Sequence, residues 1–273
     1  MELKTVKYEV DDEIATITLN RPHRMNAWTG RMHTEYRWVL ANADEDRNVR
    51  VIVVTGEGRS FCVGADSQAL EGHVEKGGYD PGTPDPLAEP GFGTSSEFDA
   101  SFAYHFGLCK PVIAAINGPA AGVGLVLACY ADIRFSVPGV KFTTAHGKLN
   151  FPAEYGLSWL LPRLIGLSAA NDLLLTSRVF TSDEAHELGL VNRLITPEKL
   201  IEETYHYARM MKDTVSPASL RETKWQIYRD QHRDVASAVF DSERLLNEMS
   251  KQNDYKEGVK AFLEKRAPKW TGD

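Results

Sequence analysis

Residues 110–130 read Lys110-Pro-Val-Ile-Ala-Ala-Ile-Asn-Gly-Pro-Ala-Ala-Gly-Val-Gly-Leu-Val-Leu-Ala-Cys-Tyr130. The apolar residues 112–116 are compatible with a buried strand, and the Asn-Gly-Pro at 117–119 then interrupts it. The small apolar residues 121–128 predict a buried helix directly after this turn. The first N–H groups of such a helix have no intrahelical acceptor, and the helix dipole adds positive potential. The turn is therefore a candidate anion site.

Composition excludes several classes of function. The chain has 273 residues and a formal net charge of −7, which argues against nucleic acid as the main partner. Its three cysteines (Cys62, Cys109 and Cys129) predict buried thiols in a reducing compartment rather than disulfides or a zinc site. The start of the chain lacks the apolar core of a signal peptide. Residues 110–130 are too interrupted to span a membrane, so we expect a cytoplasmic protein without membrane contact.

The first half of the chain is rich in predicted strands. Residues 6–19 predict a hairpin, and residues 49–55 predict a strongly β-branched strand. A helix over 29–43, which Thr29 caps, lies between them. This strand–helix–strand order predicts a crossover unit in a sheet that is at least partly buried on both faces.

Two later stretches complete the predicted organisation. Residues 72–96 are rich in glycine and proline and have no periodic pattern, so we interpret them as a loop inside one domain rather than a boundary. Residues 97–108 predict a short helix. Short strands are predicted at 131–136 and 140–143, and Asp132 and Arg134 suggest a structural polar pair. The last third of the chain is helical throughout.

The glycine-containing turns carry a family resemblance. Two segments together resemble motifs of the crotonase (enoyl-CoA hydratase/isomerase) superfamily. They are Ser-Phe-Cys-Val-Gly-Ala-Asp at 60–66 and Asn-Gly-Pro-Ala-Ala-Gly-Val-Gly at 117–124. Further segments match its other landmarks in order, namely residues 20–27, 131–134, 156–166 and 185–191. Each motif alone is modest evidence, whereas the ordered set is specific and covers nearly the whole chain.

The resemblance implies a fold and a substrate class. The fold is α/β, a crotonase-like spiral of β-β-α units over residues 1–200 that carries the acyl-CoA site. Residues 201–273 form a helical C-terminal trimerisation region, which implies a homotrimer or a hexamer built as a dimer of trimers. The ligand is an acyl-CoA thioester, with no metal and no cofactor other than the coenzyme A of the substrate.

The shared chemistry of the superfamily is stabilisation of a thioester enolate by two backbone N–H groups. Carried over by position, these groups belong to Val63 and Val123. Charge develops on the thioester oxygen when a proton leaves the adjacent carbon, and two preorganised donors act where that charge appears. Valine is acceptable at both positions because only the backbone is used. The alternative is that both turns are merely tight packing points.

The glutamates that hydratases of the superfamily use are missing. The first is expected two residues after Gly124, and that position is Val126. The second is expected where residues 144–146 read Thr-Ala-His. Each positioned acid or base typically contributes ~10²–10⁴-fold to the rate, so ordinary hydration is not the expected reaction.

One remaining carboxylate matches another branch of the superfamily. Phe-Pro-Ala-Glu-Tyr-Gly at 151–156 resembles the segment of certain enoyl-CoA isomerases whose single glutamate shuttles a proton, which makes Glu154 the candidate base. An apolar site would raise its pKa and make it a competent base. Alternatively, Glu154 only caps the following helix. His146 is the second candidate, either as an acid–base group in an atypical hydratase or as a structural histidine.

Five residues resemble those of the superfamily that contact coenzyme A. They are Arg24 in the first loop, Ala65 and Asp66 after the first oxyanion turn, and Phe262 and Lys265 near the C-terminus. The C-terminal residues sometimes act from a neighbouring subunit, whereas solvated surface charge is the alternative for Arg24 and Lys265. The sequence thus predicts an isomerase-like acyl-CoA enzyme. The alternatives are an atypical hydratase and a non-catalytic CoA-ester binder.

Overall fold

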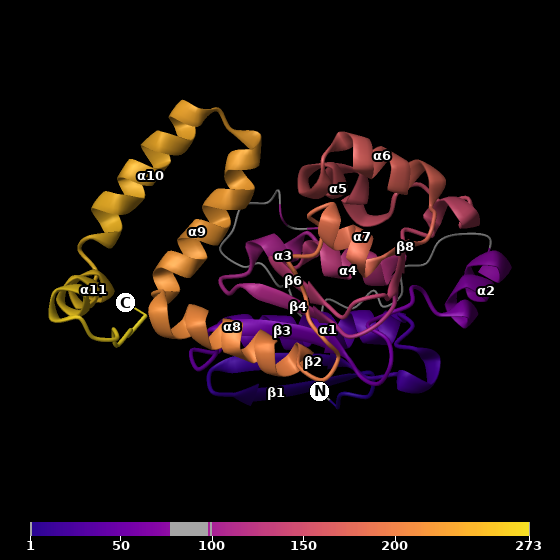
Figure 1. Cartoon of the computed structure of the whole chain (residues 1–273), viewed down its shortest axis with the longest axis horizontal. Coiled ribbons are helices and arrows are strands. Elements are labelled where there is room, and N and C mark those ends of the chain that lie inside the picture. Colours follow the sequence, from indigo (N-terminus) through magenta and orange to yellow (C-terminus); the bar gives the residue numbers. More distant parts are fainter. Residues whose placement is uncertain (1, 77–97, 99, 273) are drawn as a thin grey trace.

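The computed structural model describes residues 2–76, 98 and 100–272 and has the mixed α/β architecture that the sequence predicts. Two sheets form its body, one with six strands in the order β1-β2-β3-β4-β6-β9 and one with three in the order β5-β7-β8. Helices surround this body, and the last helices extend away from it (Figure 1). No helix within the described part of the chain is long and apolar enough to cross a membrane.

The N-terminal hairpin forms as predicted. Strand β1 (Val6–Asp11) pairs antiparallel with β2 (Ile14–Leu19), with Val6 opposite Leu19. The two turn residues, Asp12 and Glu13, have φ of 47° and 61°. Positive φ at both central residues is the geometry of the two-residue turn whose twist matches that of the flanking strands.

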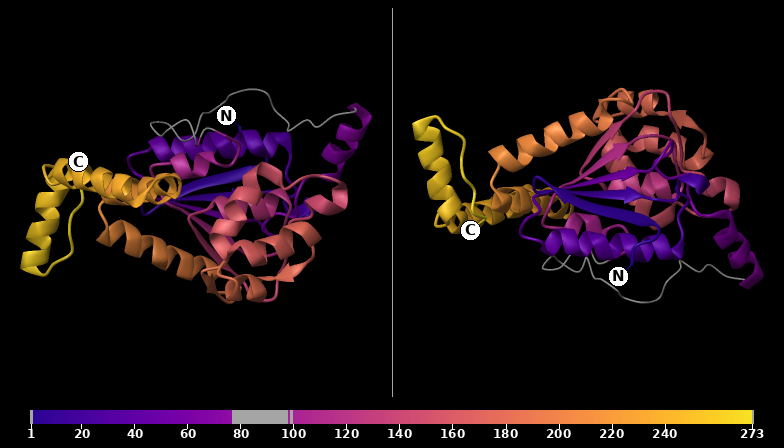
Figure 2. Two further views of the ribbon diagram at one scale, coloured as in Figure 1. Left: turned by 90° about the horizontal axis from the view of Figure 1, so that it is seen from above. Right: turned by 90° about the horizontal axis from the view of Figure 1, so that it is seen from below.

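The centre of the six-stranded sheet, strands β3 and β4, is buried on both faces. After β2 its strands run parallel, and they are β3 (Val51–Gly56), β4 (Val112–Ile116), β6 (Ile133–Ser136) and β9 (Arg193–Leu194). Because side chains alternate along a strand, Ile52 and Val54 enter the same core as α1 (Gly30–Glu45). Val51 and Val53 pack with α8 (Leu200–Thr214) instead. Figure 2 shows these two helices on opposite sides of the sheet.

The chain alternates between the two sheets, which produces the spiral. From β4 it passes to β5 (Ala120–Ala121), and from β6 to β7 (Lys141–Thr143), which pairs with both β5 and β8 (Phe180–Thr181). An isolated bridge between Cys62 and Ala120 adds the turn after β3 to this second layer. Helix α4 (Val123–Tyr130) starts directly after β5, and all eight of its residues are buried.

The remaining helices cover the ends of the sheets. The α-helices are α2 (Ser67–Lys76), α3 (Tyr104–Gly107), α5 (Leu157–Ile165), α6 (Leu167–Thr176) and α7 (Ser182–Glu187). The short 3₁₀ helices within residues 2–76 and 100–272 are η1 (Pro22–Arg24), η3 (His146–Leu149), η4 (Glu154–Gly156) and η5 (Asp230–His232). Helix α1 begins where predicted, because the Thr29 side chain accepts a hydrogen bond from the Met32 N–H.

Two predictions before β4 need correction. The helix expected over 97–108 is reduced to the four residues of α3, since Phe102 has φ of 64°, a left-handed conformation that no α-helix continues. The loop expected over 72–96 begins later than predicted, because residues 72–76 are the last turn of α2. Residues 77–96 lie outside the described part of the chain.

The C-terminal helices differ in their attachment to the body. Helix α9 (Pro217–Arg229) is tied to the sheet through Asp132, which accepts hydrogen bonds from Lys224 Nζ at 2.8 Å and Tyr228 Oη at 2.7 Å. Asp132 therefore does not form the predicted pair with Arg134, whose Nε donates to the Leu190 carbonyl at 2.6 Å. Helices α10 (Val235–Met249) and α11 (Asn253–Glu264) project beyond the body (Figure 1).

Candidate active site

The two glycine-containing turns lie against each other. The Cys62 N–H donates to the Pro119 carbonyl at 3.2 Å, and the Ala121 N–H donates to the Cys62 carbonyl at 3.0 Å. A Cβ on Gly124 would lie 2.1 Å from the Cys62 carbonyl oxygen, so only glycine allows this approach of helix and strand. The two turns, which the family resemblance assigns to one oxyanion site, thus adjoin in the structure.

The predicted oxyanion donors lie at this junction. Val123 is the first residue of α4, and Val63 follows the bridge residue Cys62. Among the described residues, neither backbone N–H has a hydrogen-bond acceptor. A Cβ on Gly122 would lie 3.8 Å from the Gly64 Cα, which shows how closely the residues beside the two donors approach. Two free N–H groups at adjoining turns can bind one anionic oxygen.

Glu154 lies over the start of α4. Its Oε2 atom is 3.6 Å from the place that a Cβ on Gly122 would occupy, directly before Val123. The side chain is half-buried, and burial raises the pKa of its carboxyl group. No hydrogen bond or ion pair joins this carboxylate to any other described residue. A half-buried carboxylate without a cationic partner is a suitable proton acceptor.

The backbone after Glu154 is unusual. Tyr155 has φ of 46° and ψ of 42°, and Gly156 has φ of 74°, so two consecutive residues are left-handed. Only then does α5 begin, at Leu157. Glu154 therefore stands one turn before α5, and the short 3₁₀ helix η4 directs it toward α4. The interpretation of Glu154 as a simple cap of α5 is not supported, because α5 has no side-chain cap.

His146, the second acid–base candidate, lies on the neighbouring segment. Strand β7 ends at Thr143, whose carbonyl accepts a hydrogen bond from the Gly122 N–H at 3.0 Å, and His146 starts the 3₁₀ helix η3 soon afterwards. The imidazole is 6% exposed, and its Nδ1 has no hydrogen-bond partner among the described residues. No hydrogen bond or ion pair joins His146 to Glu154 in the described part of the chain. A direct relay between them is not part of this geometry.

Three predicted coenzyme A contacts gather beside the first turn. Asp66 accepts hydrogen bonds from Arg24 Nη2 at 3.1 Å and from Arg21 Nη1 at 2.8 Å. Burial works to raise the pKa of Asp66, but the two guanidinium groups outweigh it and lower the pKa to about 2. Ala65 is exposed and forms a bridge with Trp28. Asp66 thus holds the loop, while Arg24 keeps an exposed guanidinium that can meet phosphate.

The other two predicted contacts lie elsewhere in the chain. Phe262 is 83% exposed on α11, and Lys265 caps that helix in a left-handed conformation. Helix α11 is at the opposite end of the molecule from α2, and α4 lies between them (Figure 1). Phe262 and Lys265 thus lie on the projecting end of the chain, and their contact with coenzyme A stays a prediction.

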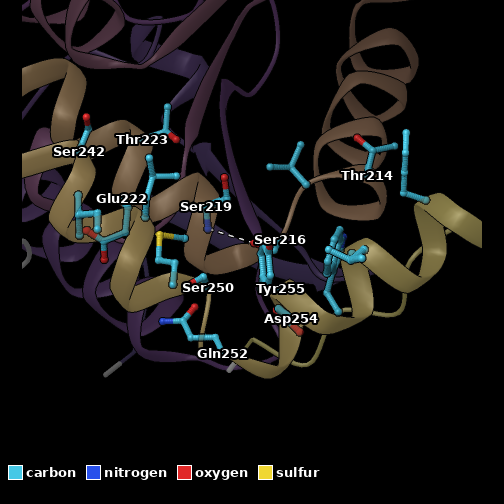
Figure 3. Close-up of a pocket in the computed structure, with 18 of the residues that line it drawn as sticks. Thr214, Ser216, Ser219, Glu222, Thr223, Ser242, Ser250, Gln252, Asp254 and Tyr255 are labelled. Carbon is cyan, nitrogen blue, oxygen red and sulfur yellow. Dashed lines mark hydrogen bonds between the residues drawn. The ribbon is translucent and has the colours of Figure 1, made fainter. Parts of the chain in front are cut away.

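A groove of about 700 Å³ opens between α9, α10 and α11 (Figure 3). Its lining mixes apolar side chains, including Leu246 and Phe262, with hydroxyl groups such as Ser216 and Ser219. The groove belongs to the projecting helices and does not include Glu154 or the glycine turns. The described residues contain no group of three or more His, Cys, Asp or Glu side chains that could hold a metal ion.

Two residues of the site region were missed from the sequence. Arg21 lies in the same first-loop motif as Arg24, but its bond to Asp66 depends on how the loop folds. Tyr130 ends α4 and donates a hydrogen bond from its hydroxyl to the Tyr155 carbonyl at 2.7 Å. A basic residue next to a family motif could have indicated Arg21, whereas no sequence signal links residues 130 and 155.

Comparison with known proteins gives consistent matches across the chain. A family profile described as "Enoyl-CoA hydratase/isomerase" matches residues 9–273. The 1,2-epoxyphenylacetyl-CoA isomerase of Escherichia coli is 33% identical, over 96% of this chain and 97% of its own. The (E)-benzylidenesuccinyl-CoA hydratase of Thauera aromatica is 31% identical, over 98% and 99%. A crystal structure of enoyl-CoA hydratase from Bacillus anthracis superimposes with a TM-score of 0.85 at 26% identity, over 99% and 100% of the two chains.

Proposed function

The chain belongs to the enoyl-CoA hydratase/isomerase family, and we propose that it catalyses isomerase-type proton transfer on an acyl-CoA thioester through Glu154. The resemblance drawn from the glycine-containing motifs is confirmed, and so is the crotonase-like fold. The chain is accordingly an enzyme of this family. The relatives include proteins named as hydratases and as isomerases, so the reaction has to be argued from the site.

The observation that carries the proposal is the place of Glu154. Its Oε2 lies 3.6 Å from where a Cβ on Gly122 would be, and the unpaired N–H of Val123 belongs to the next residue. A thioester whose oxygen accepts from Val63 and Val123 would therefore present its α-carbon near this carboxylate. The raised pKa of Glu154 favours proton abstraction near neutral pH.

The proposed reaction converts a 3-enoyl thioester into a 2-enoyl thioester. The Glu154 carboxylate takes a proton from C2, and the electron pair moves onto the thioester oxygen, which gives a dienolate. The N–H groups of Val63 and Val123 stabilise that negative charge. The same carboxyl group then returns the proton at C4 as the double bond forms between C2 and C3. Glu154 ends the cycle ionised, and neither water nor a redox partner is consumed.

We assign substrate binding to the loop beside the first glycine turn. Arg24 would meet a phosphate of coenzyme A, since its guanidinium is exposed although Asp66 orients it. Ala65 is exposed in the same loop and would contact the pantetheine arm. Coenzyme A enters as part of the substrate, and no separate cofactor takes part in the proposed step.

Glu154→Gln tests the proposal directly. With a 3-enoyl-CoA substrate, formation of the conjugated thioester is followed by its ultraviolet absorbance, and we expect the rate to fall by ~10²–10⁴-fold. Glu187→Gln, on the exposed surface of α7, is the matched control and should keep full activity. Unchanged turnover by Glu154→Gln would overturn the assignment of the base.

Atypical hydration is the second candidate, and His146 is the observation that favours it. Hydration of a 2-enoyl thioester needs a second proton-transfer group for water, and the unpartnered Nδ1 of this buried imidazole could serve. Loss of 2-enoyl-CoA hydration in His146→Ala, with 3-enoyl-CoA isomerisation retained, would identify this route. A third outcome, tight binding of CoA esters without any turnover, would indicate a non-catalytic binder, which the valine at 126 would then explain.

We also propose that the chain assembles into a homotrimer or a dimer of trimers through residues 201–273. Helices α10 and α11 carry large exposed apolar side chains, among them Phe240, Leu246 and Phe262. In such an assembly Phe262 and Lys265 would reach the site of a neighbouring copy. Light scattering at several protein concentrations tests this arrangement, and a monomer at all of them would contradict it.

A further inference from the structure

Helix α4 touches the Glu154 segment at both of its ends. At its start, Gly122 lies against the Glu154 carboxylate, as described above. At its end, the Tyr130 hydroxyl donates to the Tyr155 carbonyl at 2.7 Å. One buried helix therefore contacts both the side chain of residue 154 and the backbone that follows it.

The Tyr130 side chain is buried and closely packed. The side chain is 4% exposed, and its ring packs against Phe106 with a centroid distance of 5.1 Å. A Cβ on Gly156 would lie 3.0 Å from the hydroxyl oxygen, so the glycine is required for this approach. Burial raises the pKa of Tyr130 to about 12, and the phenol consequently remains a hydrogen-bond donor throughout the neutral range.

The hydrogen bond to the Tyr155 carbonyl helps to maintain the left-handed conformation of Tyr155. A left-handed conformation is unfavourable for a residue with a side chain, and it persists only where surrounding contacts enforce it. The Tyr155 ring packs on Phe102 at 4.9 Å, which fixes the side chain, and Tyr130 fixes the carbonyl. Release of that carbonyl would let the segment relax toward an ordinary conformation and turn Glu154 away from Gly122.

We propose that Tyr130 is a positioning residue, whose hydroxyl holds the Glu154 carboxylate at the N-terminal end of α4 through the Tyr155 carbonyl. The inference rests on the proposed function of Glu154. Because α4 also begins with the Val123 N–H, one rigid helix of about 12 Å sets both the proton acceptor and one oxyanion donor. Misplacement of a catalytic group by about 1 Å can cost ~10²-fold in rate.

Tyr130→Phe removes the hydroxyl and keeps the ring. We expect kcat to fall by about 10- to 100-fold with KM within about twofold, since substrate binding does not use this contact. The acid limb of the pH profile of kcat/KM should also move to lower pH. Burial raises the pKa of Glu154, and a released carboxylate would gain water and lose that shift.

Tyr36→Phe is the matched control. Its hydroxyl is also buried and bonded, to His105 Nε2 at 2.8 Å, but it has no bond to the 154–156 segment. We expect this variant to lose stability while its kcat and pH profile stay unchanged. If Tyr130→Phe behaves in the same way, its role is merely structural and the positioning proposal fails.

A second pair of variants covers the case in which Tyr130→Phe does not fold. Gly156→Ala places a methyl group against the Tyr130 hydroxyl, whereas Gly139→Ala has nearly the same φ, 73° against 74°, with nothing within 4 Å. Only Gly156→Ala should lower kcat and shift the profile, and equal behaviour of the two would refute the proposal. Glu154→Gln distinguishes failure of the positioning proposal from failure of the proposed function, because full activity of that variant would refute the proposed function itself.

Discussion

Helices α4 and α10 are built on opposite principles. All eight residues of α4 are buried, and its first turn accepts a strand so close that Gly124 cannot carry a side chain. No residue of α10 is buried, and Val235 and Phe240 are 80% and 70% exposed. The geometry of the site region therefore depends on the close approach of two backbone segments of the same chain. The projecting helices present apolar surface that a single chain leaves uncovered.

The difference shows where each region obtains its stability. Around α4 the energy comes from dense packing and from buried polar groups that are paired, such as Asp132 with Lys224. On α10, ion pairs such as that of Arg244 with Glu248 join exposed side chains, and such pairs contribute little. Substitutions should accordingly be costly near the site and mild in the projection.

The largest effect is expected at the contact between α4 and the first glycine turn. Gly124→Ala would place a methyl group 2.1 Å from the Cys62 carbonyl oxygen, and neither backbone can move without disturbing the other. We expect the free energy of unfolding to fall by more than ~3 kcal/mol, or soluble protein to be lost. Urea unfolding and soluble yield measure this outcome.

Gly72→Ala is the control for that substitution. Gly72 lies in α2, and a Cβ there would have nothing within 4 Å. Alanine is the better helix former, so we expect a gain of up to ~1 kcal/mol. A Gly124→Ala protein as stable as the unsubstituted chain would show that α4 is less tightly packed than its glycine indicates.

The next effect concerns the attachment of α9 to the sheet. Lys224 is 5% exposed and forms an ion pair with Asp132 at 2.8 Å, so Lys224→Met leaves a carboxylate without its cation. We expect a loss of about 3 kcal/mol in the free energy of unfolding by urea denaturation. Lys7→Met breaks an exposed pair with Glu57 and should cost at most ~1 kcal/mol. Equal losses would mean that α9 is no more firmly attached than the surface.

Stability should depend on pH in both regions, and the two regions should differ in how salt changes that dependence. The folded pKa of Asp66, about 2, lies below its ordinary value of 3.8. This carboxylate therefore contributes stability at pH values above about 4 and loses it as the pH falls toward 2. The shift corresponds to about 2 kcal/mol, which Asp66→Asn should remove at neutral pH. Urea midpoints between pH 2 and pH 7 measure the difference.

Glu257 on α11 provides the matched comparison, because its pKa is also lowered to about 2, first of all by Arg266. It lies in the projection, where solvent and salt screen the pair. In 1 M salt we expect the contribution of Glu257 to stability to vanish, while that of the buried Asp66 largely remains. If salt abolished both equally, the distinction between the regions would not hold for their ion pairs.

The smallest effect is expected on the exposed face of α10. Phe240→Ser should change the free energy of unfolding of the dilute single chain by less than ~0.5 kcal/mol, since the ring is 70% exposed. At high concentration it should weaken self-association, which light scattering measures. A loss of ~2 kcal/mol or more in the dilute chain would contradict the view that this face lacks a partner within one chain.

Local rules predicted much of the fold. The hairpin, helix α1 and the buried strands followed from apolar alternation, capping and turn residues, which act over a few neighbouring positions. The helix before β4 was predicted too long, because the left-handed Phe102 is held by packing against other rings rather than by its neighbours in sequence. The positions of Phe262 and Lys265 relative to the body could not be predicted from neighbouring residues either, because they depend on how distant segments pack.

The sequence by itself determined the hairpin, the helix and the strand that open the chain, the two glycine-containing turns, the family and the candidate base Glu154. Only the tertiary structure placed the Glu154 carboxylate over Gly122. It also formed the hydrogen bonds from the Tyr130 hydroxyl to the Tyr155 carbonyl and from Arg21 to Asp66. Turns and strands are decided by conformational preferences of adjacent residues. A site is decided by contacts between residues far apart in the chain, and these exist only once the helices and sheets have packed.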